Sequence, residues 1–125
     1  MRVTVEELYE SMGASYKSAK RVLQTDGLIA KFIQKYPTDS SFDRMRSSWT
    51  ERDAQGTFEG AHSMKGVCAN LGLDDLSARA SVLAEEFRPG NARTMDDAQV
   101  DAYIEELAQK QTMTLEAIGA FAAEQ

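Results

Sequence analysis

The stretch Ala61-His62-Ser63-Met64-Lys65-Gly66-Val67-Cys68-Ala69-Asn70-Leu71-Gly72 contains the only histidine of the chain. Apolar side chains recur in it every three or four residues, the spacing of one helix face; they are Ala61, Met64, Cys68 and Leu71. His62, Lys65 and Gly66 share another stripe, because residues three and four apart are neighbours on a helix surface. The stretch therefore predicts a helix that packs by one face and presents an imidazole on another.

The direction of His62 follows from the rotation of about 100° per residue in an α-helix. The mean direction of the apolar face then lies roughly 150° from His62, so we expect the imidazole to face water. Lys65 and Gly66 are expected beside the ring, and a wider surface around it is a candidate for contact with a partner. That surface comprises Gln55, Phe58, Glu59 and Ala69, with Phe58 as its apolar anchor.

These residue types suit the capture of a phosphoryl group. A solvent-exposed imidazole is substantially neutral near pH 7, and the neutral ring is a nucleophile that can hold phosphate as phosphohistidine. The product is dianionic, and Lys65 lies one turn away to attract it. Gly66 costs the helix about 1 kcal/mol relative to alanine, which is easier to understand if a side chain there would obstruct the ring.

Simpler interpretations exist for each residue. A surface histidine with a lysine three residues on is common on solvated helices, and Phe58 can be the edge of the core. Ser63 and His62 diverge on a helix, so hydrolase chemistry is not indicated, and Cys68 falls on the inner face. The acidic pairs are interpreted as helix starts and solvated faces without metal-binding spacing; they are Asp74/Asp75, Glu85/Glu86, Asp96/Asp97 and Glu105/Glu106.

Outside this stretch the whole chain has helical periodicity, and only two prolines interrupt it. We expect no strand. Helices are predicted at about 4–12, 15–24, 28–36, from 40 to the residues before 53, 54–71, 74–87 and 96–123.

Individual residues set the limits of these helices. Pro37 ends a helix whose stripe is Leu28, Ile29, Phe32, Ile33 and Tyr36. Asp39 and Asp53 are expected to cap the two helices that follow, with Phe42, Met45 and Trp49 as the inner face of the first. Gly72 is placed to end the histidine helix. In the last helix Gln111 and Thr114 interrupt the apolar face, which predicts that the helix bends or stops packing there.

The predicted fold is all-α, an antiparallel up-down-up-down four-helix bundle with a short N-terminal helical extension. We expect a single domain over 1–125, with the helical cap at about 1–25 and the bundle at about 26–124. The length of 125 residues suits one core.

Composition excludes several function classes. The net charge of −6 argues against nucleic acid as a partner. No apolar run approaches the roughly 18 residues of a membrane span, and the N-terminus lacks the apolar region of a secretory signal. A single cysteine allows no disulfide framework. We expect a cytoplasmic protein without a membrane partner.

The run from Ala61 to Gly66, continuing to Leu71-Gly72 and Leu76, resembles the signature of histidine-containing phosphotransfer (HPt) domains. The resemblance implies a helical bundle that shuttles phosphoryl groups to and from receiver-domain aspartates in multistep phosphorelays. His62 would be phosphorylated, Lys65 would steady the phosphate and Gly66 would keep access open. The implied partners are response-regulator receivers and the receiver of a hybrid histidine kinase. Ala84 departs from the glutamate that the family often has after the leucine at Leu83.

The sequence also limits what such a carrier does alone. No Gly-rich phosphate loop is present, so we expect no ATP-dependent kinase activity. No cofactor is expected on this chain, and the Mg²⁺ for transfer is expected on the receiver. The leading hypothesis is a free-standing, monomeric carrier. Two alternatives stay open, a non-catalytic adaptor that binds a receiver and a dimeric phosphotransferase with two histidines in a shared bundle.

Overall fold

The computed structural model describes residues 2–125, and every regular element among them is helical. In chain order the elements are α1 (Val5–Met12), α2 (Tyr16–Leu23), α3 (Asp26–Ile33), the 3₁₀ turn η1 (Tyr36–Thr38), α4 (Ser41–Thr50), α5 (Ala54–Asn70), α6 (Asp74–Phe87) and α7 (Asp97–Ala123). The prediction of an all-helical chain is confirmed.

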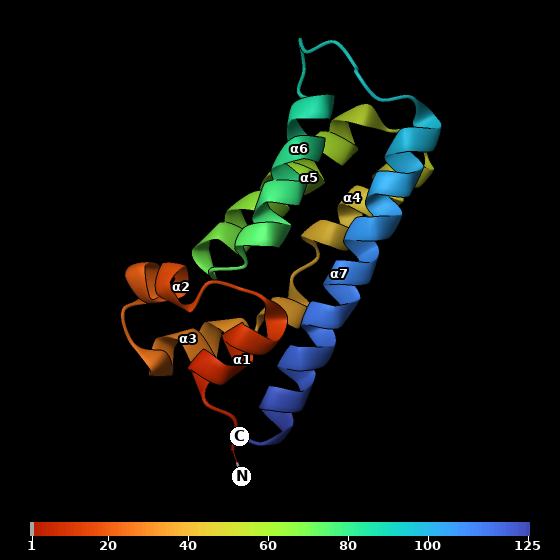
Figure 1. The fold of residues 1–125 in the computed structure, drawn as a ribbon. Coiled ribbons are helices and arrows are strands. Elements are labelled where there is room, and N and C mark those ends of the chain that lie inside the picture. The colour runs from red at the N-terminus through yellow and green to blue at the C-terminus, as the bar shows by residue number, and fades with distance from the viewer. Residues whose placement is uncertain (1) are drawn as a thin grey trace.

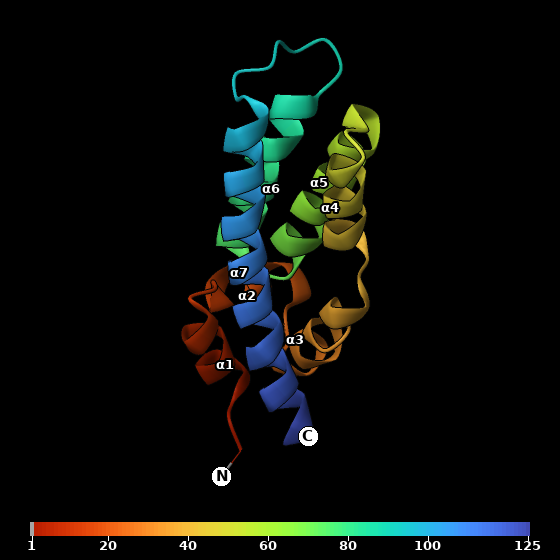
Figure 2. The same ribbon diagram turned by 90° about the vertical axis from the view of Figure 1, so that its right-hand side faces the viewer.

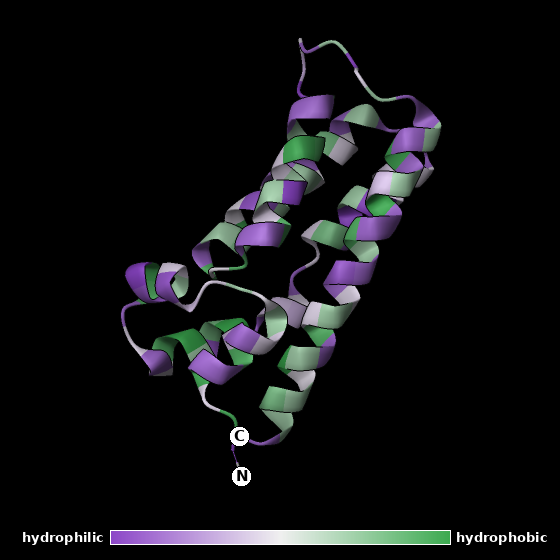
Figure 3. Ribbon diagram, viewed as in Figure 1, coloured by the Kyte–Doolittle hydropathy of each residue, from purple (hydrophilic) through white to green (hydrophobic). Residues whose placement is uncertain are grey.

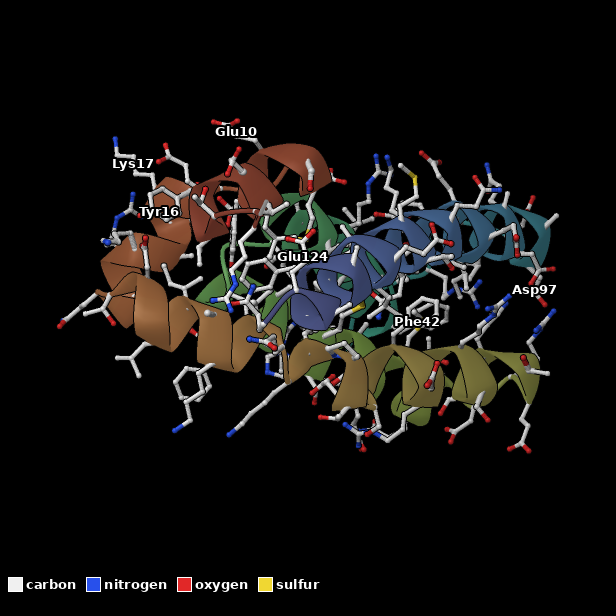
Figure 4. The ribbon with its side chains drawn as sticks, turned by 90° about the horizontal axis from the view of Figure 1, so that it is seen from below. Glu10, Tyr16, Lys17, Phe42, Asp97 and Glu124 are labelled. Atoms are coloured by element: carbon white, nitrogen blue, oxygen red, sulfur yellow. The ribbon has the colours of Figure 1, made fainter. Side chains whose placement is uncertain are left out.

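Helices α4 to α7 form the antiparallel bundle, and α1 to α3 pack at one end of it (Figures 1 and 2). The lower half of α7 extends past the other bundle helices and runs beside α1. Seen from below, Phe42 lies between α4 and α7, whereas Tyr16 and Lys17 lie on α2 at the far end (Figure 4). The prediction of a four-helix bundle with an N-terminal helical extension is therefore confirmed.

Polar side chains join α7 to both of its neighbours in the bundle. The indole N–H of Trp49 on α4 donates to Asp101 at 2.7 Å. The hydroxyl of Tyr103 donates to the Arg79 carbonyl of α6 at 2.9 Å. The apolar stripes of the helices are buried in the core. In Figure 3 hydrophobic and hydrophilic residues, green and purple, succeed one another along the bundle helices.

The predicted cap Asp53 is confirmed at the start of the histidine helix, where its side chain accepts a hydrogen bond from the Gly56 N–H at 3.1 Å. The residue that caps α4 is Ser40 and not the predicted Asp39, and the Ser40 side chain forms no capping hydrogen bond; Asp39, one residue earlier, accepts a hydrogen bond from the Ser41 N–H at 2.9 Å. Gly72 follows α5 with φ +71°, a conformation that L side chains rarely adopt, and a β-carbon there would collide with the Ser15 carbonyl. The turn after α5 thus requires glycine for two reasons.

The prediction that α7 stops packing near Gln111 and Thr114 is wrong. Both residues are buried, and the helix continues to Ile118 and Phe121, which are also buried. The Tyr36 hydroxyl donates to the Gln111 amide oxygen at 2.7 Å, and the Thr114 hydroxyl donates to the Lys110 carbonyl at 2.9 Å. Because each polar group has a partner, its burial carries no desolvation penalty large enough to open the helix.

Fewer of the apolar residues in the stripe predicted before Pro37 are buried than expected. Ile29, Ile33 and Tyr36 are buried, but Leu28 is 42% exposed and Phe32 is 38% exposed. The cause is that α3 packs on α1 and α2 by one side only, so that its other apolar side chains reach the surface. The sequence pattern does not distinguish such a surface stripe from a buried one.

Glu86 also differs from its interpretation as part of a solvated acidic pair, since it is only 6% exposed. Its carboxylate accepts hydrogen bonds from the N–H groups of Thr94 and Met95, both at 2.8 Å, and from the Thr94 hydroxyl at 2.6 Å. Arg93 forms an ion pair with it at 3.3 Å. Glu86 therefore anchors the loop between α6 and α7 to the end of the bundle.

Candidate functional site

The position of His62 depends on how α5 is held between α4 and α6. On the α4 side Gly60 is buried, and an added β-carbon would lie 2.6 Å from the Met45 backbone nitrogen, so the two helices approach closely. On the α6 side the Ser77 hydroxyl donates to the Lys65 carbonyl at 2.9 Å. With both flanks occupied, the remaining face of α5 is exposed, and it carries His62.

The imidazole of His62 stacks on Phe58, one turn earlier in α5. Their ring centroids are 5.6 Å apart and the planes are inclined by 23°. The Arg88 guanidinium lies 5.1 Å from the centroid of the Phe58 ring, and it forms an ion pair with Glu85 at 2.9 Å. Phe58 is half-buried, so it joins the histidine to the end of α6 and supports the ring from one side.

Arg88 and Glu85 were not among the predicted site residues. Arg88 comes directly after the last residue of α6, and nothing in the spacing of the sequence relates it to Phe58. Only the antiparallel packing of α5 and α6 brings the two side chains together. The only sequence signal that could have suggested Arg88 is its position as a cation at the end of α6, the helix that follows α5.

Lys65 lies half-buried one turn after His62. Within residues 2–125, no carboxylate oxygen lies within 4.0 Å of its ammonium group. The pKa of Glu85 lies below its ordinary value, chiefly because Arg88 donates a hydrogen bond to the carboxylate. The positive charge of Lys65 lowers this pKa further by a smaller amount. Of the two cations on the α6 side of the site, Arg88 thus lies over Phe58 and is paired with Glu85, whereas Lys65 lies one turn after His62.

Gly66 is exposed, and a β-carbon built on it would meet nothing within 4 Å. Packing inside this chain therefore gives no reason for glycine, unlike at Gly60. The absence of a side chain matters only for something that approaches the imidazole from solvent.

The other predicted residues also lie on the exposed face of α5. Gln55, Glu59 and Ala69 are exposed, and the Gln55 amide donates to the Glu59 carboxylate at 2.9 Å. The fold thus brings all seven predicted residues to one surface of a single helix. Their contact with a partner stays a prediction.

Two other nucleophiles near the histidine do not join it. Ser63 is half-buried on the flank of the helix. Cys68 is buried, and burial raises the pKa of its thiol to about 11. Its sulfur lies 3.3 Å from the Tyr36 hydroxyl, inside the core. Of the three side chains, only the imidazole of His62 is fully exposed to solvent, whereas Ser63 is half-buried and Cys68 is buried.

A comparison with protein families matches the Hpt domain over residues 27–112. The chain belongs to the Hpt domain family. Hpt domains act in histidine phosphotransfer within phosphorelays, and they generally interact with receiver domains. The match begins in α3 and ends within α7, so it includes His62 and leaves α1 and α2 outside. Neither curated proteins nor solved structures gave a match.

Two searches of residues 2–125 complete the description of this Hpt domain. None of the helices in this range is both long enough and apolar enough to span a membrane. The same range contains no group of three or more His, Cys, Asp or Glu side chains arranged to hold a metal ion.

Proposed function

We propose that this Hpt domain carries a phosphoryl group on His62 between the aspartates of receiver domains. The observation that carries the proposal is the exposed imidazole on a rigidly held helix, with Lys65 one turn away and open space over Gly66. An inert surface histidine requires neither the open space nor a cation without an internal partner.

The transfer step uses the ring as nucleophile. A neutral ring nitrogen of His62 donates its lone pair to the phosphorus of a receiver aspartyl phosphate. The N–P bond forms as the P–O bond to the carboxyl group breaks, and the aspartate leaves as a carboxylate. In the reverse step a carboxylate of the second receiver attacks phosphohistidine, and the imidazole is the leaving group.

The residues around the ring have separate roles in this step. Lys65 attracts the anionic phosphoryl group, since a charge-assisted contact is stronger than a neutral one. Gly66 leaves room for the acidic pocket of the receiver to approach. Phe58 fixes the plane of the imidazole through the stack, which lowers the entropic cost of reaching an in-line geometry.

The exposed surface around the histidine is proposed as the docking face for the receiver. It comprises Gln55, Phe58, Glu59 and Ala69, with the receiver providing Mg²⁺. We further propose that residues 1–125 act as one domain and as a monomer in the cytoplasm. The support for a monomer is that all the proposed site residues lie on α5, so a second chain is not needed to complete the site.

The direct test is transfer of label from a phosphorylated receiver of the same organism to the purified chain. Wild type is expected to gain an acid-labile, base-stable label, and His62→Gln is expected to gain none. Label on His62→Gln would refute the assignment of the residue. If no receiver labels the wild type, yet receivers bind wild type and His62→Gln equally, the adaptor function replaces the carrier function.

A further inference from the structure

A row of three aromatic and cationic side chains leads away from the reactive histidine. Its members are His62 and Phe58 on α5 and Arg88, directly after α6. The ring centroids of His62 and Phe58 are 5.6 Å apart, and the guanidinium carbon of Arg88 lies 5.1 Å from the Phe58 centroid. Figures 1 and 2 show that the start of α5 and the end of α6 lie at the same end of the bundle. The row therefore joins the imidazole to the neighbouring helix.

The side chain of Arg88 is held in place by Glu85, one turn earlier. Its Nε donates to both oxygens of the Glu85 carboxylate, at 3.1 and 3.3 Å, and its Nη2 donates to Oε1 at 2.9 Å. Forked contacts between a guanidinium and a carboxylate fix the orientation of both groups. The Asn91 amide donates to the Glu85 carbonyl at 2.9 Å, so the loop after α6 is tied to the same residue.

The backbone of Arg88 is fixed as well. A proline drives the residue before it to extended conformations, and Arg88, which precedes Pro89, has φ −60° and ψ 130°. The Asn91 N–H donates to the Arg88 carbonyl at 3.0 Å and closes a four-residue turn. Proline at its second position and Gly90 with φ +93° at its third are typical of a type II turn. Groups outside the row thus fix both the side chain and the main chain of Arg88.

Phe58, the middle member of the row, gains a fixed neighbour from this arrangement. It is only half-buried, so packing against the core does not enclose its ring. A cation within about 6 Å of an aromatic centroid is attracted to the π-electrons of the ring. Arg88 meets this distance, and its ion pair with Glu85 keeps it there. Arg88 therefore restricts the motion of the Phe58 ring away from His62.

The orientation of the His62 imidazole depends on its stack with Phe58. Within residues 2–125, no other group of the chain forms a hydrogen bond or an ion pair with the imidazole. An exposed side chain without such partners keeps its rotamer freedom, and ordering it costs entropy. Transfer requires a ring nitrogen aimed at the phosphorus, in line with the bond that breaks. A well-ordered Phe58 ring therefore raises the fraction of imidazoles that are ready to react.

We propose that Arg88 is a positioning residue for phosphotransfer: held by Glu85, it keeps Phe58 stacked on His62 and so orders the imidazole for in-line attack. This inference rests on the proposed function and adds to it a residue from outside α5. Arg88 acts on the ring before any phosphate is present. In this it differs from Lys65, whose charge serves the phosphoryl group. The rate of transfer thereby depends on the turn after α6 as well as on the histidine helix.

The single histidine of the chain allows a direct test, because its two carbon-bound ring protons give one pair of NMR signals. The ring current of Phe58 displaces these signals, and Phe58→Leu defines their position without a stack. Without any phosphate, Arg88→Ala is expected to move both signals toward the Phe58→Leu values. Arg79→Ala is the matched control, since Arg79 also lies on α6 and pairs with an acid, Asp75, at 3.1 Å. Its histidine signals are expected to equal those of wild type.

Single-turnover transfer from a phosphorylated receiver gives the second readout. Arg88→Ala is expected to slow transfer about two- to fivefold, the factor that corresponds to a cation–π contact at an exposed site. In the Phe58→Leu background the same substitution is expected to cause no further loss, because the effects of residues that act through one another are not additive. Arg79→Ala is expected to transfer at the wild-type rate. Fluorescence of Trp49 during urea unfolding verifies that each variant folds.

Histidine signals in Arg88→Ala that equal those of wild type would overturn the inference. Equal loss of rate from Arg88→Ala with and without the Phe58 ring would also overturn it, and would assign Arg88 to direct contact with the phosphoryl group. Absence of transfer to wild type from every receiver would instead overturn the carrier function. The NMR comparison needs no receiver, so it then still decides whether Arg88 orders the imidazole.

Discussion

At position 66 an added β-carbon would meet no atom within 4 Å, so a larger side chain fits the fold but stands in the open space beside His62. At Lys65 the ammonium group has no carboxylate within 4.0 Å in the described part of the chain. The fold requires neither side chain, so substitutions at these two positions test function without loss of stability.

Gly66→Leu is therefore expected to raise the free energy of unfolding by up to about 1 kcal/mol, since leucine is a better helix former than glycine. The same substitution is expected to block phosphotransfer. Gly119→Leu on α7 is the matched control, because an added β-carbon there also meets nothing within 4 Å. Both variants are measured by urea unfolding and by label transfer. Transfer by Gly66→Leu at the rate of Gly119→Leu would show that access is not the reason for glycine.

Lys65→Ala is expected to slow transfer about tenfold or more, because a charge-assisted contact contributes about 1.5–3 kcal/mol. Stability is expected to change by less than about 0.5 kcal/mol, as for other surface substitutions. Lys65→Arg keeps the positive charge and is expected to recover most of the rate. The comparison of single-turnover rates for the three proteins checks the role of the charge, and equal rates for all three would refute it.

At the scale of elements, the close approach of α4 to α5 holds the histidine helix in place. Gly60 allows this approach, since its β-carbon would lie 2.6 Å from the Met45 nitrogen. Glu86 in turn holds the loop that joins α6 to α7. Both contacts concern stability rather than the chemistry of the ring.

Gly60→Ala is expected to destabilise the protein by about 1–3 kcal/mol, because the methyl group overpacks the α4–α5 contact. Gly66→Ala on the same helix is expected to raise the free energy of unfolding, because alanine is a better helix former and its methyl group meets no other atom. Urea unfolding followed by the fluorescence of Trp49, the single tryptophan, measures both. If Gly60→Ala unfolds with the same free energy as wild type, α4 can shift away from α5 without loss of stability.

Glu86→Gln is expected to lower the free energy of unfolding at pH 7 by about 1–3 kcal/mol, because hydrogen bonds to a buried charge are lost. Burial raises the pKa of Glu86, but hydrogen bonds from Thr94, Met95 and Arg93 outweigh it, so the pKa lies below its ordinary value. The free energy of unfolding that wild type has in excess of Glu86→Gln is therefore complete above the ordinary glutamate pKa of about 4.3. This difference declines as the pH falls below that value. Unfolding midpoints at pH 7 and pH 3 test this, and a pH-independent difference would contradict it.

At the scale of the whole molecule, the sequence predicted the helices, the bundle and the exposed histidine, because apolar periodicity reports which face of each helix is buried. It did not predict the exposure of Phe32, the burial of Glu86 or the proximity of Arg88 to Phe58. These features depend on how separate helices meet, and no spacing within one helix contains that information. Gln111 was misinterpreted for the same reason, since its partner Tyr36 is distant in the chain.

The measurement that tests the central claim most directly is a complete relay in one tube. Labelled phosphate is placed on one receiver, a second unlabelled receiver is added, and the chain is supplied as wild type or as His62→Gln. The account predicts that label reaches the second receiver with wild type, passes through phosphohistidine on the way, and stays on the first receiver with His62→Gln. Label on the second receiver in the presence of His62→Gln, at the wild-type rate, would contradict it.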